Sequence, residues 1–354
     1  MKQEQRHWGT VGEKQVFLFT LSNENGYAAD ISNYGGIVAG FRMPDLCGKV
    51  KDIVLGFSSL DEYLKDHPNI GTLIGRYGNR IANACFSLDG ITYRLLANDG
   101  KNTLHSGNRG FGRQVWKAES VNRPDAAGIR LSYLSPDGED GFPGNLRTEV
   151  TYWLTGHNEL EIEYRASTDK PTVIAFTNHA YWNLSGEGSG DILSHELELN
   201  AKYITIVREG LIPTGEFLAV KNTPFDFTVP TPIGLHINDE SHLLTFGFGY
   251  DHNWVIDRSG ETGLVQAASL YEPDSGRYME VFTTEPGIQF YAGNHLDGTL
   301  VGKSNLPYTK RSGLCLETQH FPDSPNHANF PSTVLRQNED FYSRTLYRFS
   351  VRSN

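Results

Sequence analysis

The sequence lacks the segments by which secreted and membrane proteins are recognised. Its start, Met1–Lys14, has no apolar core of the kind that a secretory signal requires. No stretch approaches the ~18 apolar residues of a membrane-spanning helix. The 3 cysteines, Cys47, Cys85 and Cys315, show no CxxC spacing, which predicts reduced, buried thiols. We therefore expect a cytoplasmic protein with no membrane partner.

Concentrated positive charge is also missing. The chain has 31 Lys and Arg against 42 Asp and Glu, a formal net charge of -11, and no Lys/Arg-rich block. A phosphate-backbone partner would need such a block, so we exclude nucleic acid. The sequence also has no HExxH, no Cys/His cluster with zinc spacing, no EF-hand loop, no P-loop and no GxSxG elbow. We expect neither a metal nor another cofactor.

What the sequence contains is a long succession of short strand-like segments. Residues 148–166 alternate apolar and polar side chains on both sides of a turn at Thr155–Asn158, which predicts an antiparallel hairpin with one solvated face. The dipeptide Asp89-Gly90 predicts a second hairpin over residues 86–93. Further strands are expected over residues 15–21, 27–32, 37–42, 195–199, 203–207, 254–257, 263–270, 278–283, 288–291 and 342–351.

Helix signals are few, and no linker, composition shift or fixed repeat marks a domain boundary. One short helix is expected over Ser59–Lys65, with Ser58 or Ser59 as its N-cap. Many short strands separated by Gly, Pro and Asn turns are typical of a sandwich or barrel. We predict a single all-β domain over residues 1–354, a large antiparallel β-sandwich with few short helices.

A carboxylate stands at the end of one apolar run. Leu314–Leu316 predicts a buried strand, Glu317 interrupts it, and a proline-rich loop follows. Burying a carboxylate is costly unless it is paired or hydrogen-bonded. Glu317 is therefore either a structural ion pair or loop cap, or a general base whose pKa is set by a partly desolvated pocket. His320 and His327 flank the loop with no metal spacing, so we expect them to face solvent.

Five other stretches place polar side chains beside glycines or aromatic residues. They cover residues 74–81, 102–107, 176–184, 249–254 and 284–294. A surface turn with salt bridges, or a histidine held in the core, is an ordinary explanation for each of them. The candidates for function that they contribute are Asn79, Arg80, His105, His179, Asp251 and Gln289.

Taken in order, these stretches resemble the motifs of the aldose 1-epimerase family, the mutarotases. The matching segments lie within residues 12–350 and are Gly75–Ala82, Leu104–His105, Thr177–Leu184, Tyr250–Asn253, Gln289–Asn294, Leu316–Gln319 and Pro322–Asn326. The resemblance implies a β-supersandwich fold and interconversion of the α- and β-anomers of free hexoses such as galactose and glucose, without a cofactor. We expect a monomer or a homodimer.

The resemblance also implies roles for the candidate residues. Glu317 would be the base and His179 the acid, with His105 beside them at the catalytic centre and in contact with the sugar. Opening a cyclic hemiacetal requires both an acid and a base, because the anomeric hydroxyl loses a proton while the ring oxygen gains one. We expect a nearby carboxylate to raise the pKa of His179, and Glu317 and His179 to set the acid and basic limbs of the pH profile. The remaining sugar contacts would come from Asn79, Arg80, Asp251 and Gln289.

Two departures from the family pattern are expected to concern the pocket lining. Ser106 stands where many relatives have glycine, and Trp182 stands where phenylalanine is usual. Trp182 or Phe290 could contact the apolar face of the sugar, although a core position is the better prediction for Phe290. We expect these departures to affect sugar preference and not the type of reaction.

Two alternative functions stay open. A hexose-6-phosphate 1-epimerase would need a cationic phosphate pocket, which Arg76 together with Arg80 would offer. A non-catalytic sugar-binding sandwich is the other alternative. Such a module would have no reason to keep both Glu317 and His179.

Overall fold

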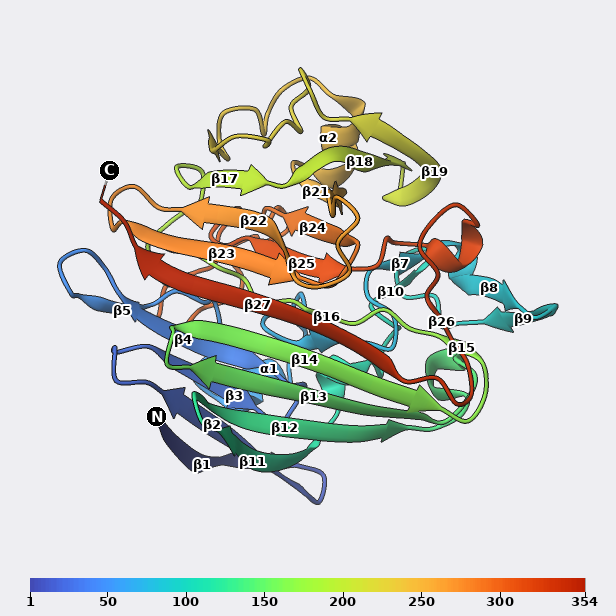
Figure 1. Ribbon diagram of the computed structural model, residues 1–354, viewed down its shortest axis with the longest axis horizontal. Coiled ribbons are helices and arrows are strands. Elements are labelled where there is room, and N and C mark those ends of the chain that lie inside the picture. Colours follow the sequence, from blue (N-terminus) through green and yellow to red (C-terminus); the bar gives the residue numbers. More distant parts are fainter. Residues whose placement is uncertain (354) are drawn as a thin grey trace.

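The computed structural model describes residues 1–353, and its regular secondary structure is mainly antiparallel strand with few short helices, as predicted (Figure 1). Its largest sheet has nine strands, and the long ones run side by side across the molecule. Their order is β11 (Lys117–Arg123), β12 (Ala126–Ser135), β13 (Leu146–Thr155), β14 (Glu159–Thr168), β27 (Phe341–Val351), β23 (Arg277–Thr283), β22 (Val265–Tyr271), β17 (Glu196–Leu199) and β20 (Thr231–Pro232).

Two five-stranded sheets accompany it. The first comprises β1 (Lys2–Val11), β2 (Lys14–Ser22), β3 (Ala28–Ser32), β4 (Val38–Pro44) and β5 (Val50–Asp52). The second has the order β19 (Ile212–Ala219), β18 (Ala201–Arg208), β21 (Asp251–Ile256), β24 (Gly287–Tyr291) and β25 (Cys315–Gln319), and it carries most of the predicted site.

Short paired strands and helices complete the fold. The two-stranded sheets are β7 (Arg80–Ile81) with β10 (Thr103–Leu104), β6 (Leu73–Ile74) with β16 (Thr177–Asn178), β8 (Cys85–Leu88) with β9 (Ile91–Arg94), and β15 (Thr172–Val173) with β26 (Val334–Leu335). The α-helices are α1 (Leu60–Tyr63) and α2 (His242–Gly247), and 3-10 turns cover Ala82–Ala84, Phe111–Arg113, Glu139–Gly141 and Ser324–Asn326. None of the helices within residues 1–353 combines the length and apolar content needed to cross a membrane.

Strand β27 joins the layers of the core. Phe349 on β27 stacks on Phe41 of β4 with ring centroids 4.1 Å apart, which ties the first five-stranded sheet to the nine-stranded one. On the same strand Thr345 meets Thr318 of β25, with 2.5 Å between their hydroxyl oxygens. Thr318 therefore lies on the face of β25 that packs in the core. Because side chains alternate along a strand, Glu317 and Gln319 lie on the opposite face.

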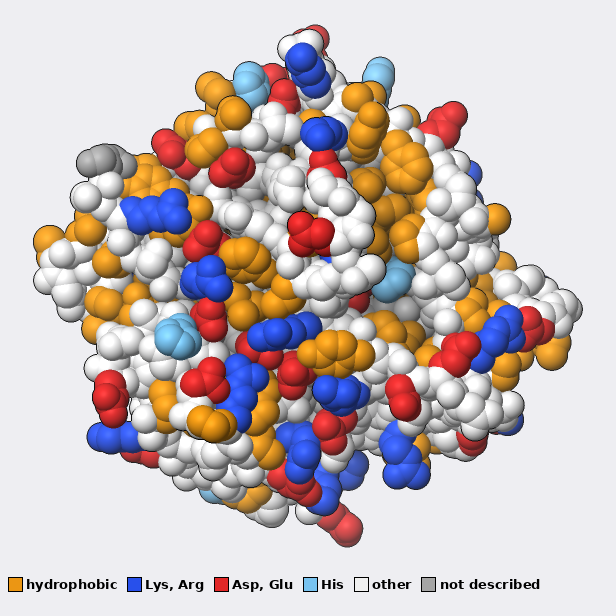
Figure 2. All heavy atoms as spheres, in the orientation of Figure 1, with side chains coloured by type: hydrophobic (Ala, Val, Ile, Leu, Met, Phe, Trp, Pro, Cys, Tyr) orange, Lys and Arg blue, Asp and Glu red, His pale blue; other side chains and the backbone are white. Residues whose placement is uncertain are grey.

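The predicted hairpins and the predicted helix are confirmed. Strands β13 and β14 pair as expected, and Figure 2 shows acidic and basic side chains interspersed over the face on which they lie. Ser59 is the N-cap of α1, where its N–H donates to Glu62 Oε2 at 3.1 Å. The cysteines differ from expectation, because only Cys315 is buried whereas Cys47 is exposed.

Candidate active site

A cavity of about 150 Å³ lies against strands β21, β24 and β25. Its walls come from segments far apart in the sequence. Of the predicted site residues, Gln289 alone does not line it, while Asn79, Arg80, His105, His179, Asp251 and Glu317 all do. The other lining residues are Pro68, Asn69, Leu104, Tyr181, Tyr291 and His295.

The register of these strands explains why three predicted residues meet. Gln289 on β24 lies opposite Glu317 on β25, and Asp251 on β21 lies opposite Tyr291 on β24. Because side chains alternate along a strand, Gln289 and Tyr291 share one face of the sheet, and their partners share it with them. Gln289 Nε2 donates a hydrogen bond of 2.6 Å to Asp251 Oδ1 and so holds that carboxylate at the pocket wall.

His179 follows β16 and is fixed by its backbone. Its N–H donates to the Thr72 carbonyl at 2.9 Å, and its own carbonyl accepts from the N–H of Gly71 at 2.9 Å. The ring Nε2 lies 3.7 Å from Glu317 Oε1, and the ring Nδ1 lies 3.4 Å from Cys315 Sγ. One imidazole nitrogen is therefore aimed at the carboxylate, and the buried thiol supports the other.

His105 follows β10 and is tied to Asn79 twice. Its N–H donates to the Asn79 carbonyl at 3.0 Å, and the Asn79 N–H donates to His105 Nδ1 at 3.1 Å. Since Nδ1 accepts a proton donor, the neutral ring carries its own proton on Nε2. The ring centroid lies 5.2 Å from that of His179, edge to face. His105 thus offers an N–H donor beside His179 and Glu317.

Arg80, on β7, brings positive charge to the cavity. Its Nε binds Asp99 Oδ2 at 2.8 Å, and its side chain is only 12% exposed. A guanidinium has five N–H donors, and Asp99 is its only hydrogen-bonded side-chain partner within residues 1–353. Donors are therefore left for a ligand.

Burial dominates the protonation of Glu317 and His179. Desolvation, reinforced by the charge of Asp251, raises the pKa of Glu317 well above its usual range. Desolvation lowers the pKa of His179 to about 4 and holds that of His105 well below its usual value. The expectation that a carboxylate raises the pKa of His179 is wrong, because burial outweighs it. A single proton on the pair rests on Glu317 and not on His179.

Known proteins are similar in sequence to this chain over nearly its full length. A family model described as aldose 1-epimerase matches residues 18–348. The chain belongs to the aldose 1-epimerase family. It is 44% identical over 340 residues to the galactose mutarotase of Sus scrofa, with 96% of each chain covered. It is 38% identical over 336 residues to the aldose 1-epimerase of Escherichia coli (strain K12), with 94% of each covered.

Solved structures of the family share the fold. An aldose epimerase homologue from C. elegans superimposes with a TM-score of 0.86 at 32% identity, covering 95% of this chain and 99% of that one. The galactose 1-epimerase of Lactobacillus acidophilus gives a TM-score of 0.87 at 26% identity, covering 99% of both chains. The predicted antiparallel sandwich is therefore the fold of the family as well as of this protein.

His105, His179 and Glu317 raise the question of a metal, because their ligand atoms all lie within 4.8 Å of one another. Two imidazoles and a carboxylate are a common ligand set for transition metals. A ligating imidazole must offer a nitrogen lone pair, however. In His105 the Nδ1 lone pair accepts the Asn79 N–H, and Nε2 carries the proton. The donor set fits a metal poorly, and we assign none to it.

The aromatic residues of the pocket lie one position away from those predicted. Trp182 faces the core, where it packs on the aromatic rings of β27, so its assignment to the pocket lining is wrong. Phe290 is also in the core, which was the better prediction for it. Their neighbours Tyr181 and Tyr291 line the cavity instead. Both tyrosines stand inside the stretches singled out above, and strand alternation from Gln289 points to Tyr291.

Two other residues expected near the sugar are structural. Ser106 Oγ accepts from the Tyr77 N–H at 2.5 Å and donates to the Tyr77 carbonyl at 3.1 Å, so it fixes a backbone and does not line the pocket. Arg76 is 2% exposed. Its guanidinium donates to the carbonyls of Ser135, Pro136 and Pro143. It is therefore not free to bind a phosphate.

The histidines beside the proline loop, His320 and His327, were predicted to face solvent, but each is mostly buried and paired with a carboxylate. His320 Nδ1 lies 2.6 Å from Glu285 Oε2, and that carboxylate raises the pKa of the imidazole despite its burial. His327 Nε2 lies 3.2 Å from Asp323 Oδ2. Each side chain is only 18% exposed. They brace the loop that follows Glu317 and do not reach the cavity.

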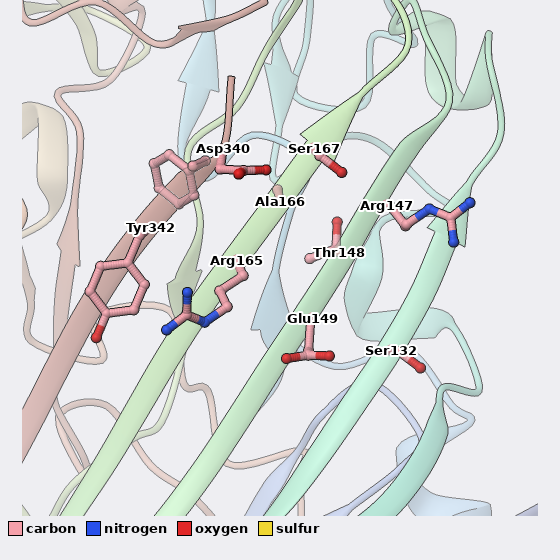
Figure 3. Close-up of a pocket in the computed structure, with 10 residues that line it drawn as sticks. Ser132, Arg147, Thr148, Glu149, Arg165, Ala166, Ser167, Asp340 and Tyr342 are labelled. Atoms are coloured by element: carbon pink, nitrogen blue, oxygen red, sulfur yellow. The ribbon is translucent and has the colours of Figure 1, made fainter. Parts of the chain in front are cut away.

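A larger hollow of about 460 Å³ lies elsewhere, on the outer face of the nine-stranded sheet (Figure 3). Arg165 covers the ring of Tyr342 there, with its guanidinium carbon 4.6 Å from the ring centroid. Arg147 and Glu149 stand on the neighbouring strand β13. Neither Glu317 nor His179 lines this hollow, and we assign it no ligand.

Proposed function

We propose that this protein interconverts the α- and β-anomers of free hexoses, with galactose and glucose as substrates. The observation that carries the proposal is a buried carboxylate and imidazole, Glu317 and His179, facing each other at 3.7 Å on the wall of a polar cavity. Membership of the aldose 1-epimerase family supports the same reaction, an isomerisation.

In the proposed reaction Glu317 removes the proton of the anomeric hydroxyl as the bond between C1 and the ring oxygen breaks. Protonated His179 delivers its proton to the ring oxygen, which gives the open-chain aldehyde with a hydroxyl in that place. Rotation about the C1–C2 bond presents the other face of the aldehyde. The two transfers in reverse then close the ring as the other anomer, so nothing is consumed.

The active pair carries one proton, which rests on Glu317 before the sugar binds. For Glu317 to act as the base, that proton must pass to His179, a change between two microstates of equal net charge. Hydrogen bonds to an ionised carboxylate favour the ionised form. Sugar hydroxyls that donate to Glu317 would therefore favour the reactive microstate.

Sugar recognition is proposed to come from the polar side chains around this pair. Arg80, Asn79 and the Nε2–H of His105 supply donors, and the carboxylate of Asp251 supplies an acceptor. Gln289 was predicted to hold the sugar directly. Its hydrogen bond to Asp251 supports a role in orienting that carboxylate instead.

The alternatives have less support. A sugar-phosphate epimerase would need cationic side chains to bind the phosphate, and Arg76 and Arg80 were the candidates. Arg76 is not available for this, because its guanidinium is bound to backbone carbonyls. The cavity draws on residues from Pro68 to Glu317, which supports one domain acting as a unit. A cytoplasmic location and a monomeric or homodimeric state stay predictions.

Polarimetry tests the proposal directly. Freshly dissolved α-galactose and α-glucose approach their equilibrium rotation slowly, and the protein should accelerate this approach in proportion to its concentration. Heat-denatured protein at the same concentration is the control. If neither sugar, but a hexose 6-phosphate, responded, the phosphate alternative would replace this one; if nothing responded while sugar bound, the chain would be a sugar-binding module.

A further inference from the structure

A row of amide side chains continues the sheet face behind Glu317. Asn253 on β21 lies opposite Gln289 on β24, and Gln289 lies opposite Glu317 on β25. Gln319, two residues beyond Glu317, stands on the same face of β25. The four side chains are almost fully buried, at 1%, 3%, 2% and 0% exposed for Asn253, Gln289, Glu317 and Gln319.

Gly287 has no side chain and so leaves space that the Asn253 amide occupies. Gly287 lies opposite Gln319 in the ladder between β24 and β25. A Cβ placed on Gly287 would come within 2.5 Å of Asn253 Oδ1 and 2.9 Å of a ring carbon of Phe321. The Asn253 amide therefore lies over Gly287, the residue that Gln319 faces across the ladder, and the Phe321 ring lies against the same position.

The polar atoms of this row lack partners. Asn253 Oδ1 and Nδ2, Gln319 Oε1 and Nε2, Gln289 Oε1 and Glu317 Oε2 are buried with no hydrogen bond to any part of the described chain. Leaving one buried polar group unsatisfied costs about 1–3 kcal/mol, so a cluster of them is not expected to persist dry. Ordered water that makes about three hydrogen bonds is the usual partner of such groups.

The two oxygens of Glu317 therefore have different surroundings. Oε1 faces His179 at 3.7 Å on the cavity side. Oε2 is buried without a partner, and so are two side-chain donors on the same face of the sheet, Asn253 Nδ2 and Gln319 Nε2. We propose that Asn253 and Gln319 are positioning residues, whose amides hold ordered water against Glu317 Oε2 and so stabilise the ionised carboxylate. This inference rests on the proposed function of Glu317 as the base.

Several charged or titratable groups act on Glu317 besides this row, and the test must keep them unchanged. They come from every element around it, namely Arg80, His105, His179, Tyr181, Asp251, Tyr291, Cys315 and Tyr347. Substitutions of Asn253 and Gln319 remove no charge from this set.

The variants that test the proposal are Gln319→Met, of nearly the same shape, and Asn253→Leu. The matched control is Thr318→Val, which alters the opposite face of the same strand, where Thr318 contacts Thr345. The pKa of Glu317 is read from its carboxyl carbon by NMR titration, with the signal assigned by its loss in Glu317→Gln. Polarimetry gives kcat and KM for α-galactose, and thermal unfolding gives stability.

In the two amide variants we expect the pKa of Glu317 to rise by about one unit or more, since a hydrogen bond to a charged group is lost. We expect kcat to fall by about tenfold for each unit while KM stays unchanged, because neither side chain lines the cavity. Gln319→Asn, which keeps an amide, should restore most of the wild-type pKa. Thr318→Val should leave the pKa of Glu317 unchanged.

A purely structural role predicts a different pattern, in which the melting temperature falls and the pKa of Glu317 does not move. That pattern, or an equal pKa shift in Thr318→Val, would overturn the proposal. Because Gln319→Met and Asn253→Leu test the same proposal, one of them can still decide it if the other does not fold. The NMR titration of Glu317 does not require the protein to be active. If the wild-type protein were inactive on every hexose, the proposed function would be refuted, and the titration would still show whether the amides stabilise the ionised carboxylate.

Discussion

Replacing Glu317 by glutamine changes one oxygen to an amide and leaves the shape of the side chain intact. The variant cannot accept the anomeric proton, and loss of a positioned general base typically costs about 10²–10⁴-fold in rate, or about 3–5 kcal/mol of transition-state stabilisation. Binding should persist, because Arg80, Asn79 and Asp251 still line the cavity. We therefore expect kcat for α-galactose to fall by this factor with little change in KM.

The same substitution should stabilise the fold, and the pH dependence of this gain follows from the pKa of Glu317. Burial raises that pKa in the folded protein, so between its ordinary value of 4.5 and its raised value the folded state binds more protons than the unfolded state. Stability of the wild-type protein therefore falls as pH rises through this window, by about 1.4 kcal/mol for each pH unit. Glutamine does not titrate and escapes this loss.

Polarimetry at several galactose concentrations measures the kinetic effect, and thermal unfolding between pH 4 and pH 8 measures the stability effect. The melting temperature of Glu317→Gln should match that of the wild type near pH 4 and exceed it increasingly above. The control is Glu163→Gln on the outer face of the nine-stranded sheet, which should change neither quantity appreciably. The assignment of Glu317 is refuted if Glu317→Gln keeps near-normal kcat, or if its loss of activity accompanies loss of the folded state.

Further predictions concern the surroundings of the acid–base pair. Arg80→Ala and Asp251→Ala should each lower kcat/KM by about 10–100-fold, the equivalent of one charge-assisted hydrogen bond, and wild-type values for both would misplace the sugar. The wild-type rate should fall near pH 4, where His179 takes up a second proton, and again above the usual range of a carboxyl, where Glu317 loses the last one. His179→Asn should be about 10²–10⁴-fold slower and lack the fall near pH 4. Exhaustive EDTA dialysis should leave the rate unchanged, and a loss reversed by zinc or magnesium would contradict our assignment of the histidines.

A site residue could be predicted from the sequence where the pattern of neighbouring residues sets its surroundings. It could not be predicted where contacts with distant parts of the chain set them. Glu317 and Gln289 interrupt apolar strands, and that interruption is visible in the sequence alone. The aromatic wall was misplaced because Trp182 was judged by its type, whereas in the segment after β16 it is Tyr181, two residues beyond His179, that lines the cavity. His295 and Asn69 reach the pocket through turns of the chain that no local pattern reports.

The fold shows the same division. Alternation predicted β13 and β14 because one face is apolar and the other polar. Strand β1 was missed because Lys2–Val11 is polar on both faces and is held in place by pairing with β2. Arg76 has the sequence signature of a recognition residue, yet its guanidinium is used to bind backbone carbonyls of another loop. Contacts across 59 residues or more of chain cannot be inferred from local composition.

The pH profile shows most clearly why the protonation of the site could not be predicted from the sequence alone. The ordinary values of Glu and His place the carboxyl below the imidazole, which predicts an ionised Glu317 facing a protonated His179. Desolvation acts on both groups and favours the neutral form of each, so it reverses that order. Before a sugar binds, the pair therefore keeps its proton on Glu317, and the reactive charge pair must be favoured by groups that donate hydrogen bonds to the carboxylate. Sugar hydroxyls can do this on the Oε1 side, and water held by the amides of Asn253 and Gln319 can do it on the Oε2 side. If the amide row contributes as proposed, part of the stabilisation needed for proton transfer is built into the sheet before the sugar arrives, and only the remainder must come from the substrate.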